Sequence, residues 1–383
     1  MAALLVIIPD VLSDIIKKGE ITPRYYNPGN LFEEVHILMT NNDKPEPQKL
    51  RSTVGNAKLF LHNIHLPGSK RTLGYKPWLL KVWARPAVKL AEKIKPGLIR
   101  CHGNWFNGFL ASRINKKLGI PYVVSIHTQP EDFRGEAISA FGKKYFRTVD
   151  FIEEKTLQNA DIILPVYASL LPYLKKKGYT KYEVAYNVLN GESLKEKKNY
   201  TLHNPVSLLS VGRHFRGKNP ENIIRAIKKL PDVHLTLIGD GPYQGNLQRI
   251  TQECDVENRV SFLKAINNDE LCNQLSDYDI FVVHNEYLGI PKAVMEPLLT
   301  GLPVIANRRK GESVPELQDD HVLLVENTPE GYRDGLKKLI EDHEFREKLG
   351  RRAYEFAREK WAPAKTEAKY VEIYKKVMAQ AGN

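Results

Sequence analysis

The chain alternates short, continuous apolar runs with longer stretches whose apolar residues recur at helical spacing. The apolar runs predict buried strands, in one series before residue 200 and another after it. The first series is 4–9, 35–39, 98–101, 122–126 and 162–166, and the second is 206–211, 235–239, 260–263, 280–283, 303–306 and 321–325. Helical patterns such as 79–94 and 108–118 lie between the strands. This alternation is typical of parallel sheets that helices cover on both faces.

Two such series predict two doubly wound α/β domains, in agreement with 383 residues at roughly 150 residues per domain. The polar stretch 190–204 is the expected linker, so we expect domains at 1–200 and 201–364. A last helix, 365–383, is expected to join the first domain. Ligands of open parallel sheets bind beyond the carboxyl ends of the strands, so two facing sheets would place the site in an interdomain cleft.

Composition places the chain among globular proteins. Hydrophobic residues make up 42% and charged residues 27%, which argues against general disorder. No apolar run approaches the ~18 residues of a membrane span, and residues 1–9 lack the basic start of a signal peptide. The three cysteines lie far apart, at Cys101, Cys254 and Cys272, which excludes a disulfide framework and a cysteine zinc site. We therefore expect a cytoplasmic protein.

The net charge of +12 is concentrated in one segment, because residues 51–100 hold eleven basic residues and one acid, Glu92. Such a segment suits phospholipid, nucleic acid or an anionic substrate, and a solvated basic face is the alternative. Within 66–95 the cations are interleaved with Trp78 and Trp83, which favours an anionic membrane surface. The alternative is a helix that buries both tryptophans. No nucleic-acid motif accompanies the segment, so we expect no nucleic-acid partner.

The loop that follows the strand 206–211 carries two cations. Gly212 permits a tight exit from the strand, and Arg213 and Lys218 come directly after it. Arginine offers a fork of donors and lysine a compact charge, so together they suit a diphosphate. A solvated basic loop is the alternative.

Two further loops of the second half suit the same kind of ligand. Gly239 and Gly241 follow a strand and either let a ligand approach the backbone or simply form a turn. Gly289 and Pro291 mark the start of a helix, where free N–H groups favour an anion. Glu296 lies within that helix, where a carboxylate can accept hydrogen bonds from ribose hydroxyls. The alternative is an ordinary amphipathic helix.

Two histidines, His102 and His127, follow successive strands of the first half and could point into a cleft. An ordinary hydrogen-bonding role is the alternative for both. No HExxH or comparable spacing occurs, so a histidine metal site is not expected.

In this order and spacing the motifs resemble the retaining GT-B glycosyltransferases of glycosyltransferase family 4 (glycosyl transferases group 1), most strongly over 205–330. The resemblance implies two facing Rossmann-like domains. It also implies transfer of a hexose-type sugar from a nucleotide-diphosphate sugar to a glycan or lipid-linked acceptor, in polysaccharide biosynthesis. Retention, independence of metals and cofactors, and a UDP-sugar rather than a GDP-sugar are further expectations. So is a peripheral position on the cytoplasmic face of the membrane.

The resemblance also assigns residues to roles. It implies that Arg213 and Lys218 stabilise the leaving diphosphate, that His127 lies near the transferred sugar, and that Glu286 is a further catalytic candidate. The implied donor-binding residues are Gly212, Gly239, Gly241, Lys264, Gly289, Ile290, Pro291, Lys292 and Glu296. The expected acceptor-binding residues are Gly19, Tyr25, His102, Asn104 and Trp105.

Three points leave alternatives open. Leu288 stands where the family usually has a glutamate, so either Glu286 reaches the donor sugar through a shifted loop or that contact is absent. A catalytically weak nucleotide-sugar or glycan-binding protein, or a phosphorylase or epimerase on the same fold, would fit the same motifs. Asp277 and Asp279 spell the metal-binding triplet of the other large glycosyltransferase fold. They precede a strand at its amino end, and we interpret them as surface structure.

Overall fold

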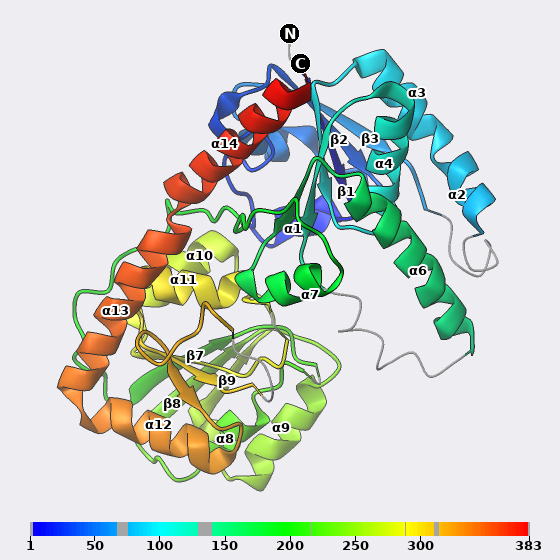
Figure 1. The fold of residues 1–383 in the computed structure, drawn as a ribbon. Helices are drawn as coiled ribbons and strands as arrows, with labels where there is room; N and C mark the ends of the chain where they lie inside the picture. The colour runs from blue at the N-terminus through cyan, green and yellow to red at the C-terminus, as the bar shows by residue number, and fades with distance from the viewer. Residues whose placement is uncertain are drawn as a thin grey trace. The chain divides into compact units, whose positions relative to one another are not determined.

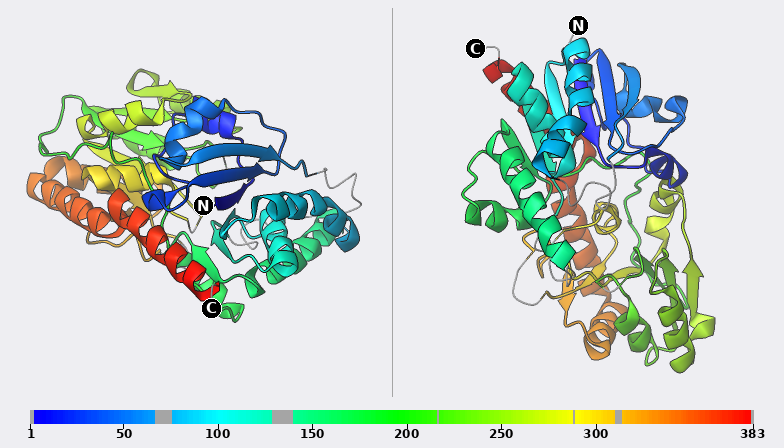
Figure 2. Two further views of the ribbon diagram at one scale, coloured as in Figure 1. Left: turned by 90° about the horizontal axis from the view of Figure 1, so that it is seen from above. Right: turned by 90° about the vertical axis from the view of Figure 1, so that its right-hand side faces the viewer.

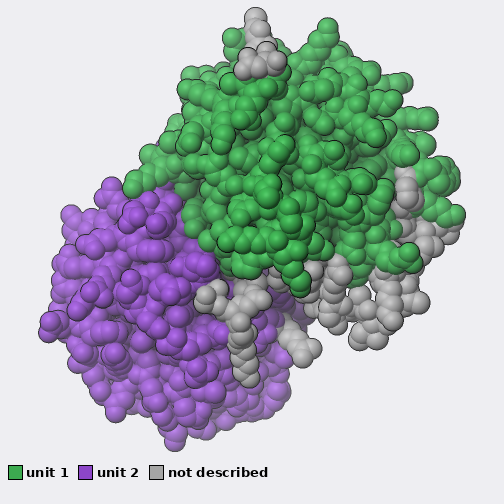
Figure 3. Space-filling view, in the orientation of Figure 1, with its two compact units in different colours: residues 1–17, 21–188, 364–383 green, residues 18–20, 189–363 purple. Residues whose placement is uncertain are grey.

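The computed structural model describes residues 3–66, 76–128, 140–215, 217–287, 289–309 and 314–381. The chain divides into two compact units, which Figure 3 shows in different colours. Unit 1 comprises residues 1–17, 21–188 and 364–383, and unit 2 comprises residues 18–20 and 189–363. Each unit holds a six-stranded parallel sheet, which can be followed in Figures 1 and 2. The expected α/β class with two Rossmann-like domains is therefore confirmed.

The strands of unit 1 are β1 (Ala3–Ile8), β2 (Glu34–Met39), β3 (Lys58–Asn63), β4 (Leu98–His102), β5 (Tyr122–Ile126) and β6 (Ile162–Pro165). Its α-helices are α1 (Leu12–Lys17), α2 (Pro77–Trp83), α3 (Arg85–Ile94), α4 (Phe106–Leu118), α6 (Ala140–Gln158), α7 (Leu171–Lys176) and α14 (Pro363–Ala381). Short 3-10 helices span Pro28–Asn30, Pro47–Val54 and Ala168–Leu170. The strand order is β3-β2-β1-β4-β5-β6, and every neighbouring pair is parallel.

Both faces of the unit 1 sheet carry a hydrophobic core. Successive side chains of a strand point to opposite faces, so one strand can contribute to both cores. On one face, Leu5 and Ile7 of β1 share a core with residues of α3, α4 and α6. On the other face, Leu4, Val6 and Ile8 share a core with α14. Such two-sided burial explains why the strands are continuous apolar runs in the sequence.

The strands of unit 2 are β7 (Val206–Val211), β8 (Val233–Ile238), β9 (Val260–Leu263), β10 (Ile280–Val283), β11 (Val304–Asn307) and β12 (Leu323–Val325). Its α-helices are α8 (Glu221–Ile227), α9 (Gln244–Glu253), α10 (Asn268–Gln274), α11 (Lys292–Thr300), α12 (Pro329–Glu341) and α13 (His343–Trp361), and 3-10 helices span Glu257–Arg259 and Leu275–Asp277. The order β12-β11-β10-β7-β8-β9 is again parallel throughout. The carboxyl ends of β7, β10 and β11 therefore lie next to one another.

The amino-terminal part of unit 1 ends at Val188, before the expected boundary at 200. The stretch 190–204, the expected linker, belongs to unit 2. The Lys197 N–H donates to the carbonyl of Thr300 (2.7 Å), and the Tyr200 hydroxyl donates to the carbonyl of Gly301 (3.0 Å). These bonds attach the segment to the end of α11. Because they are made by a backbone N–H and a single hydroxyl, the polar composition of the segment does not reveal that it is packed.

Two elements differ from the sequence predictions. The edge strand β3 escaped detection because it lacks a continuous apolar run. Three of its six residues are polar, and three are exposed, including Phe60. The pattern at 79–94, expected to be one helix, is divided at Ala84 into α2 and α3. Pro86 lies in the first turn of α3, where its missing N–H costs no hydrogen bond.

Helix α14 is fixed to unit 1 by polar bonds as well as by its core residues. Arg24 donates two hydrogen bonds to the Glu367 carboxylate, at 2.6 and 2.7 Å. Arg24 thereby lowers the pKa of Glu367. The Tyr370 hydroxyl donates to the carbonyl of Ala185 at 3.1 Å. The guanidinium of Arg100, buried on β4, lies 4.7 Å from the centre of the Tyr370 ring.

Two glycines after β8 are required by close backbone packing. A Cβ atom on Gly239 would lie 1.9 Å from the carbonyl oxygen of Gly212, and one on Gly241 would lie 2.2 Å from that of His214. Both residues also have φ values that L-residues rarely adopt, +143° and +152°. These glycines therefore let two loops at the carboxyl edge of the sheet touch, a structural role beside any contact with a ligand.

We expect Gly239→Ala to lower the free energy of unfolding by more than about 2 kcal/mol, because strain and a backbone clash add. Urea unfolding measures this change. Gly245→Ala is the matched control, since a Cβ there meets nothing within 4 Å. Equal stability of the two variants would show that the Gly212–Gly239 contact is not required.

Candidate functional site

Unit 2 has a pocket at the carboxyl ends of β7 and β10. Residues of three loops line it, among them Gly212, His214, Lys218, His284, Asn285 and Pro291. The pocket lies at the sheet edge where ligands of parallel α/β sheets bind. It brings Gly212, Lys218 and Pro291 together, as the sequence predicted from separate motifs.

Lys218 is the central cation of this pocket. Its Nζ lies over the neighbouring rings of Phe215 and Tyr287, 6.0 and 5.9 Å from their centres. Burial lowers the pKa of Lys218, and repulsion by Arg309 and Arg213 lowers it further. Several positive charges thus converge on a half-buried amine. Such an arrangement is stabilised by a bound anion.

His284, which the sequence analysis did not single out, holds the Lys218 loop. Its buried Nδ1 accepts a hydrogen bond from the N–H of Asn219 at 3.1 Å, so Nδ1 carries no proton in this contact. Burial lowers the pKa of His284, although Glu286 opposes the shift. The Glu286 carboxylate lies 3.4 Å from Nε2 of His284 and is 57% exposed. In the described part of the chain, Glu286 is not among the residues that line the pocket.

Arg309, after β11, is a third cation that the sequence analysis missed. Its Nε donates to the carbonyl of Asn285 (3.2 Å) and its Nη2 to that of Gly289 (3.4 Å). The amide of Asn285 also donates to the Gly289 carbonyl, at 3.0 Å. Arg309 therefore both supports the loop before α11 and adds positive charge near Lys218. No motif marks it, although its position after an apolar strand could have been a signal.

Glu296 is buried on α11 and does not line the pocket around Lys218. The amide of Asn268 donates to its Oε1 at 3.3 Å. Burial raises the pKa of Glu296 to about 7, and Lys292 and Asn268 partly oppose this shift. The carboxyl is thus available in both protonation states near neutral pH.

The remaining donor candidates are distributed around this sheet edge. Pro291 is the N-cap residue of α11, directly before Lys292, and Ile290 is buried. Lys264 is exposed at the end of β9. Leu288, the departure from the family pattern, lies outside the described residues.

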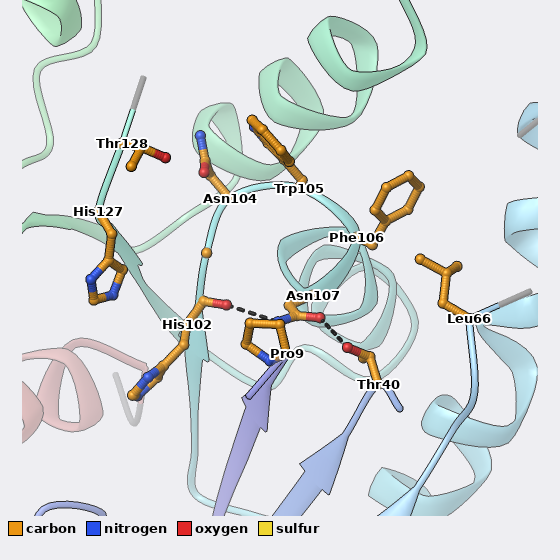
Figure 4. Close-up of a pocket in the computed structure, with 11 residues that line it drawn as sticks. Pro9, Thr40, Leu66, His102, Asn104, Trp105, Phe106, Asn107, His127 and Thr128 are labelled. Carbon is orange, nitrogen blue, oxygen red and sulfur yellow. Dashed lines mark hydrogen bonds between the residues drawn. The ribbon is translucent and has the colours of Figure 1, made fainter. Parts of the chain in front are cut away.

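Unit 1 has its own pocket at the carboxyl ends of β1, β4 and β5. Figure 4 shows its two sides: His102 and His127 lie on one side, and Leu66 and Phe106 lie on the other. Asn104 and Trp105 also line it, so four of the predicted residues come together here. The pocket therefore offers both polar partners and apolar surface.

Hydrogen bonds hold the polar side of the unit 1 pocket. The His102 carbonyl accepts from the amide of Asn107 at 2.9 Å, and Asn104 donates to the carboxylate of Glu153. Burial lowers the pKa of His102 well below its usual range, and Arg100 and His127 reinforce this shift. His102 is therefore neutral at physiological pH and can accept a hydrogen bond.

Two predicted acceptor residues lie elsewhere. Tyr25 packs against the edge of the His102 ring, with centroids 5.8 Å apart, and does not line the described pocket. Gly19 belongs with unit 2, where a Cβ would lie 2.2 Å from Nδ2 of Asn267. Its tight packing against Asn267 explains the need for glycine there. The structure thus gives Gly19 a packing role in unit 2.

The interpretation of Asp277 and Asp279 as surface structure needs correction for Asp279. This residue is buried, and its carboxylate accepts from the N–H groups of Ser207 (2.8 Å) and His203 (3.1 Å). It therefore holds the amino ends of β7 and β10. Among the described residues, no group of three or more metal-binding side chains is assembled. None of the described helices has both the length and the apolar character needed to cross a bilayer.

Known proteins resemble the chain in both halves. The curated relatives include LpsE of Rhizobium meliloti, a lipopolysaccharide core biosynthesis glycosyltransferase, 28% identical over 39% of this chain and 43% of LpsE. The sulfoquinovosyl transferase SQD2 of Arabidopsis thaliana is 27% identical over 69% of this chain and 53% of SQD2. The chain thus matches about half the length of each relative. The solved structure of Anabaena HepE with UDP and glucose has a TM-score of 0.73 at 14% identity, covering 98% of this chain and all of HepE.

Two family models divide the chain between them. The model described as Glycosyltransferase Family 4 matches residues 33–192, and the one described as Glycosyl transferases group 1 matches residues 192–356. The fold agrees, since HepE shares it over nearly the whole length. The chain therefore belongs to the GT-B glycosyltransferases of the family 4 type.

Proposed function

We propose that this glycosyltransferase moves a hexose-type sugar from a nucleotide-diphosphate sugar to a glycan or lipid-linked acceptor, with retention. The observation that carries the proposal is that Lys218 lines the pocket at the carboxyl edge of the unit 2 sheet. Arg213 and Arg309 follow strands β7 and β11, which lie on either side of β10, and both are near enough to lower the pKa of Lys218. A diphosphate supplies the negative charge that this cluster needs. HepE, whose structures hold UDP and UDP-glucose, supports UDP as the nucleotide.

The proposed reaction breaks the bond between the anomeric carbon and the β-phosphate oxygen. The negative charge that develops on this oxygen is stabilised by Lys218, Arg213 and the first N–H groups of α11, so no metal is required. The acceptor hydroxyl attacks the same face of the sugar and gives its proton to the leaving phosphate oxygen. The neutral His102, with His127, orients hydroxyl groups in the unit 1 pocket.

The first test is nucleotide binding in the presence of EDTA. UDP at 100 times its Kd should raise the free energy of unfolding by about 2.7 kcal/mol relative to the protein without nucleotide. GDP, ADP and dTDP at the same concentration should raise it less. Lys218→Met should remove this stabilisation and lower kcat by on the order of 10²-fold. Lys229→Met, an exposed lysine of unit 2, is the control. If no nucleotide stabilises the protein, the assignment of the donor site is wrong. If a nucleotide binds but no sugar is transferred, the protein is better described as a nucleotide-sugar-binding protein.

Arg309 and its neighbour Arg308 form a matched pair for testing the third cation. Arg308 is exposed and bonds to Asp319 at 2.9 Å, away from the loop that Arg309 supports. Arg309→Gln should weaken UDP binding by about tenfold or more, since hydrogen bonds to charged groups contribute ~1.5–3 kcal/mol. Arg308→Gln should leave it unchanged. Calorimetric titration with UDP and UMP checks this, and equal losses for both nucleotides would argue against a contact with the β-phosphate.

The raised pKa of Glu296 predicts a pH dependence. If its carboxylate accepts hydrogen bonds from the donor ribose, the KM for the donor should fall as the pH rises through about 7. Glu296→Gln should remove this dependence. Donor KM measured from pH 5.5 to 8.5 provides the check, and a flat profile in the wild type would place the ribose elsewhere.

The same shift affects stability with a defined sign. The pKa of Glu296 in the folded protein lies above its unfolded value, so protonation of Glu296 favours the folded state. This contribution to the free energy of unfolding is present at low pH and is lost as the pH rises to about 7. Glu296→Gln should therefore gain stability relative to the wild type between pH 5 and pH 8. Urea unfolding at these two pH values separates this effect from nucleotide binding.

A further inference from the structure

Helix α2 presents an unusual surface for a segment that packs on a core. Trp78 is 60% exposed and Val82 is 44% exposed, although both are large and apolar. The alternative in which Trp78 is buried by its helix is therefore wrong. The opposite side of the segment does face the core, through the buried residues Leu80 and Ala84.

The exposed residues form one stripe. Trp78, Val82, Arg85 and Lys89 follow at spacings of four, three and four residues, which places them on one side of a helix. The stripe continues from α2 into α3, because Ala84 between them keeps right-handed helical angles (φ −76°, ψ −13°). We call these four residues the α2 stripe.

The segment that carries the stripe is rich in exposed positive charge. Lys76 at the N-cap of α2 and Lys81 within it are exposed, and so are Lys93 and Lys95 at the end of α3. Glu92 is the single acid in the described segment 76–95. Exposed tryptophan with a ring of lysine and arginine suits the interface of an anionic bilayer, where apolar side chains enter the headgroup region and cations contact lipid phosphates. A nucleic acid would use the charge but not Val82.

The buried side of the same segment leads to the unit 1 pocket. The Trp83 indole donates to the carbonyl of His65 at 3.0 Å, directly before Leu66. The Trp83 ring meets that of Phe106 edge-on, with centroids 6.4 Å apart. Leu66 and Phe106 form the apolar side of the pocket, as Figure 4 shows. The α2 segment and the apolar wall of the pocket are therefore in direct contact.

We propose that the α2 stripe docks unit 1 on an anionic phospholipid bilayer. Trp78 and Val82 enter the headgroup region, and Arg85 and Lys89 contact lipid phosphates. Because Trp83 of the same segment contacts Phe106, docking holds the apolar wall of the unit 1 pocket near the membrane surface.

The test is binding of the full-length protein to vesicles of phosphatidylcholine alone and with 30 mol% phosphatidylglycerol, at physiological salt. The wild type should bind the anionic vesicles at least tenfold more strongly. Trp78→Ser/Val82→Ser should lower binding at least tenfold, and Lys81→Glu/Arg85→Glu should do the same. Lys228→Glu/Lys229→Glu changes the net charge equally at exposed positions of unit 2 and should leave binding within twofold.

Several outcomes would overturn the inference. These are failure of the wild type to bind anionic vesicles, an equal loss in the Lys228/Lys229 control, or tighter binding to a single-stranded RNA at the same salt. The last outcome would assign the stripe to nucleic acid instead. UDP stabilisation should be unchanged in the stripe variants. Membrane binding without UDP binding would contradict the proposed function alone, whereas UDP binding without membrane binding would contradict this inference alone.

Discussion

Each parallel sheet must be covered on both faces, and this requirement determines how the chain is organised. In unit 1 the residues of β1 divide between two cores, and the second core is completed by α14. The last helix of the described chain thus covers one face of the first sheet and belongs to the core of unit 1. The Arg24–Glu367 pair and the Tyr370 hydroxyl hold it there through bonds to residues far away in the sequence.

Parallel strands also bring together loops that are distant in the sequence. The Lys218, Asn285 and Arg309 loops follow strands β7, β10 and β11, which are neighbours in the sheet. Hydrogen bonds between side chains and backbone hold these loops: the N–H of Asn219 donates to the His284 ring, and the Arg309 guanidinium donates to the carbonyls of Asn285 and Gly289. The fold can therefore hold like charges close to one another before any ligand binds. This preorganisation is what makes such a site suitable for stabilising a leaving phosphate.

The sequence predicted most of the fold because strands buried on both faces are continuous apolar runs. This pattern did not reveal β3, which is an edge strand with polar residues. It also did not reveal that 190–204 is packed, because individual hydrogen bonds hold that polar segment in place. The same contrast applies to the sites. Lys218, His102 and His127 were found because they belong to motifs or follow recognisable strands. His284 and Arg309 act through contacts with backbone atoms of other loops, which no local pattern reveals.

The position of α14 has a consequence for biosynthesis. A ribosome completes residues 189–363 before it completes the helix that closes the second core of unit 1. Unit 2 is nearly continuous in sequence and can fold as soon as Pro363 has emerged, whereas unit 1 must wait for residues near Tyr374 and Val377. During synthesis one face of the amino-terminal sheet therefore lacks the part of its apolar cover that α14 supplies. The domain that is made first is the one that finishes folding last.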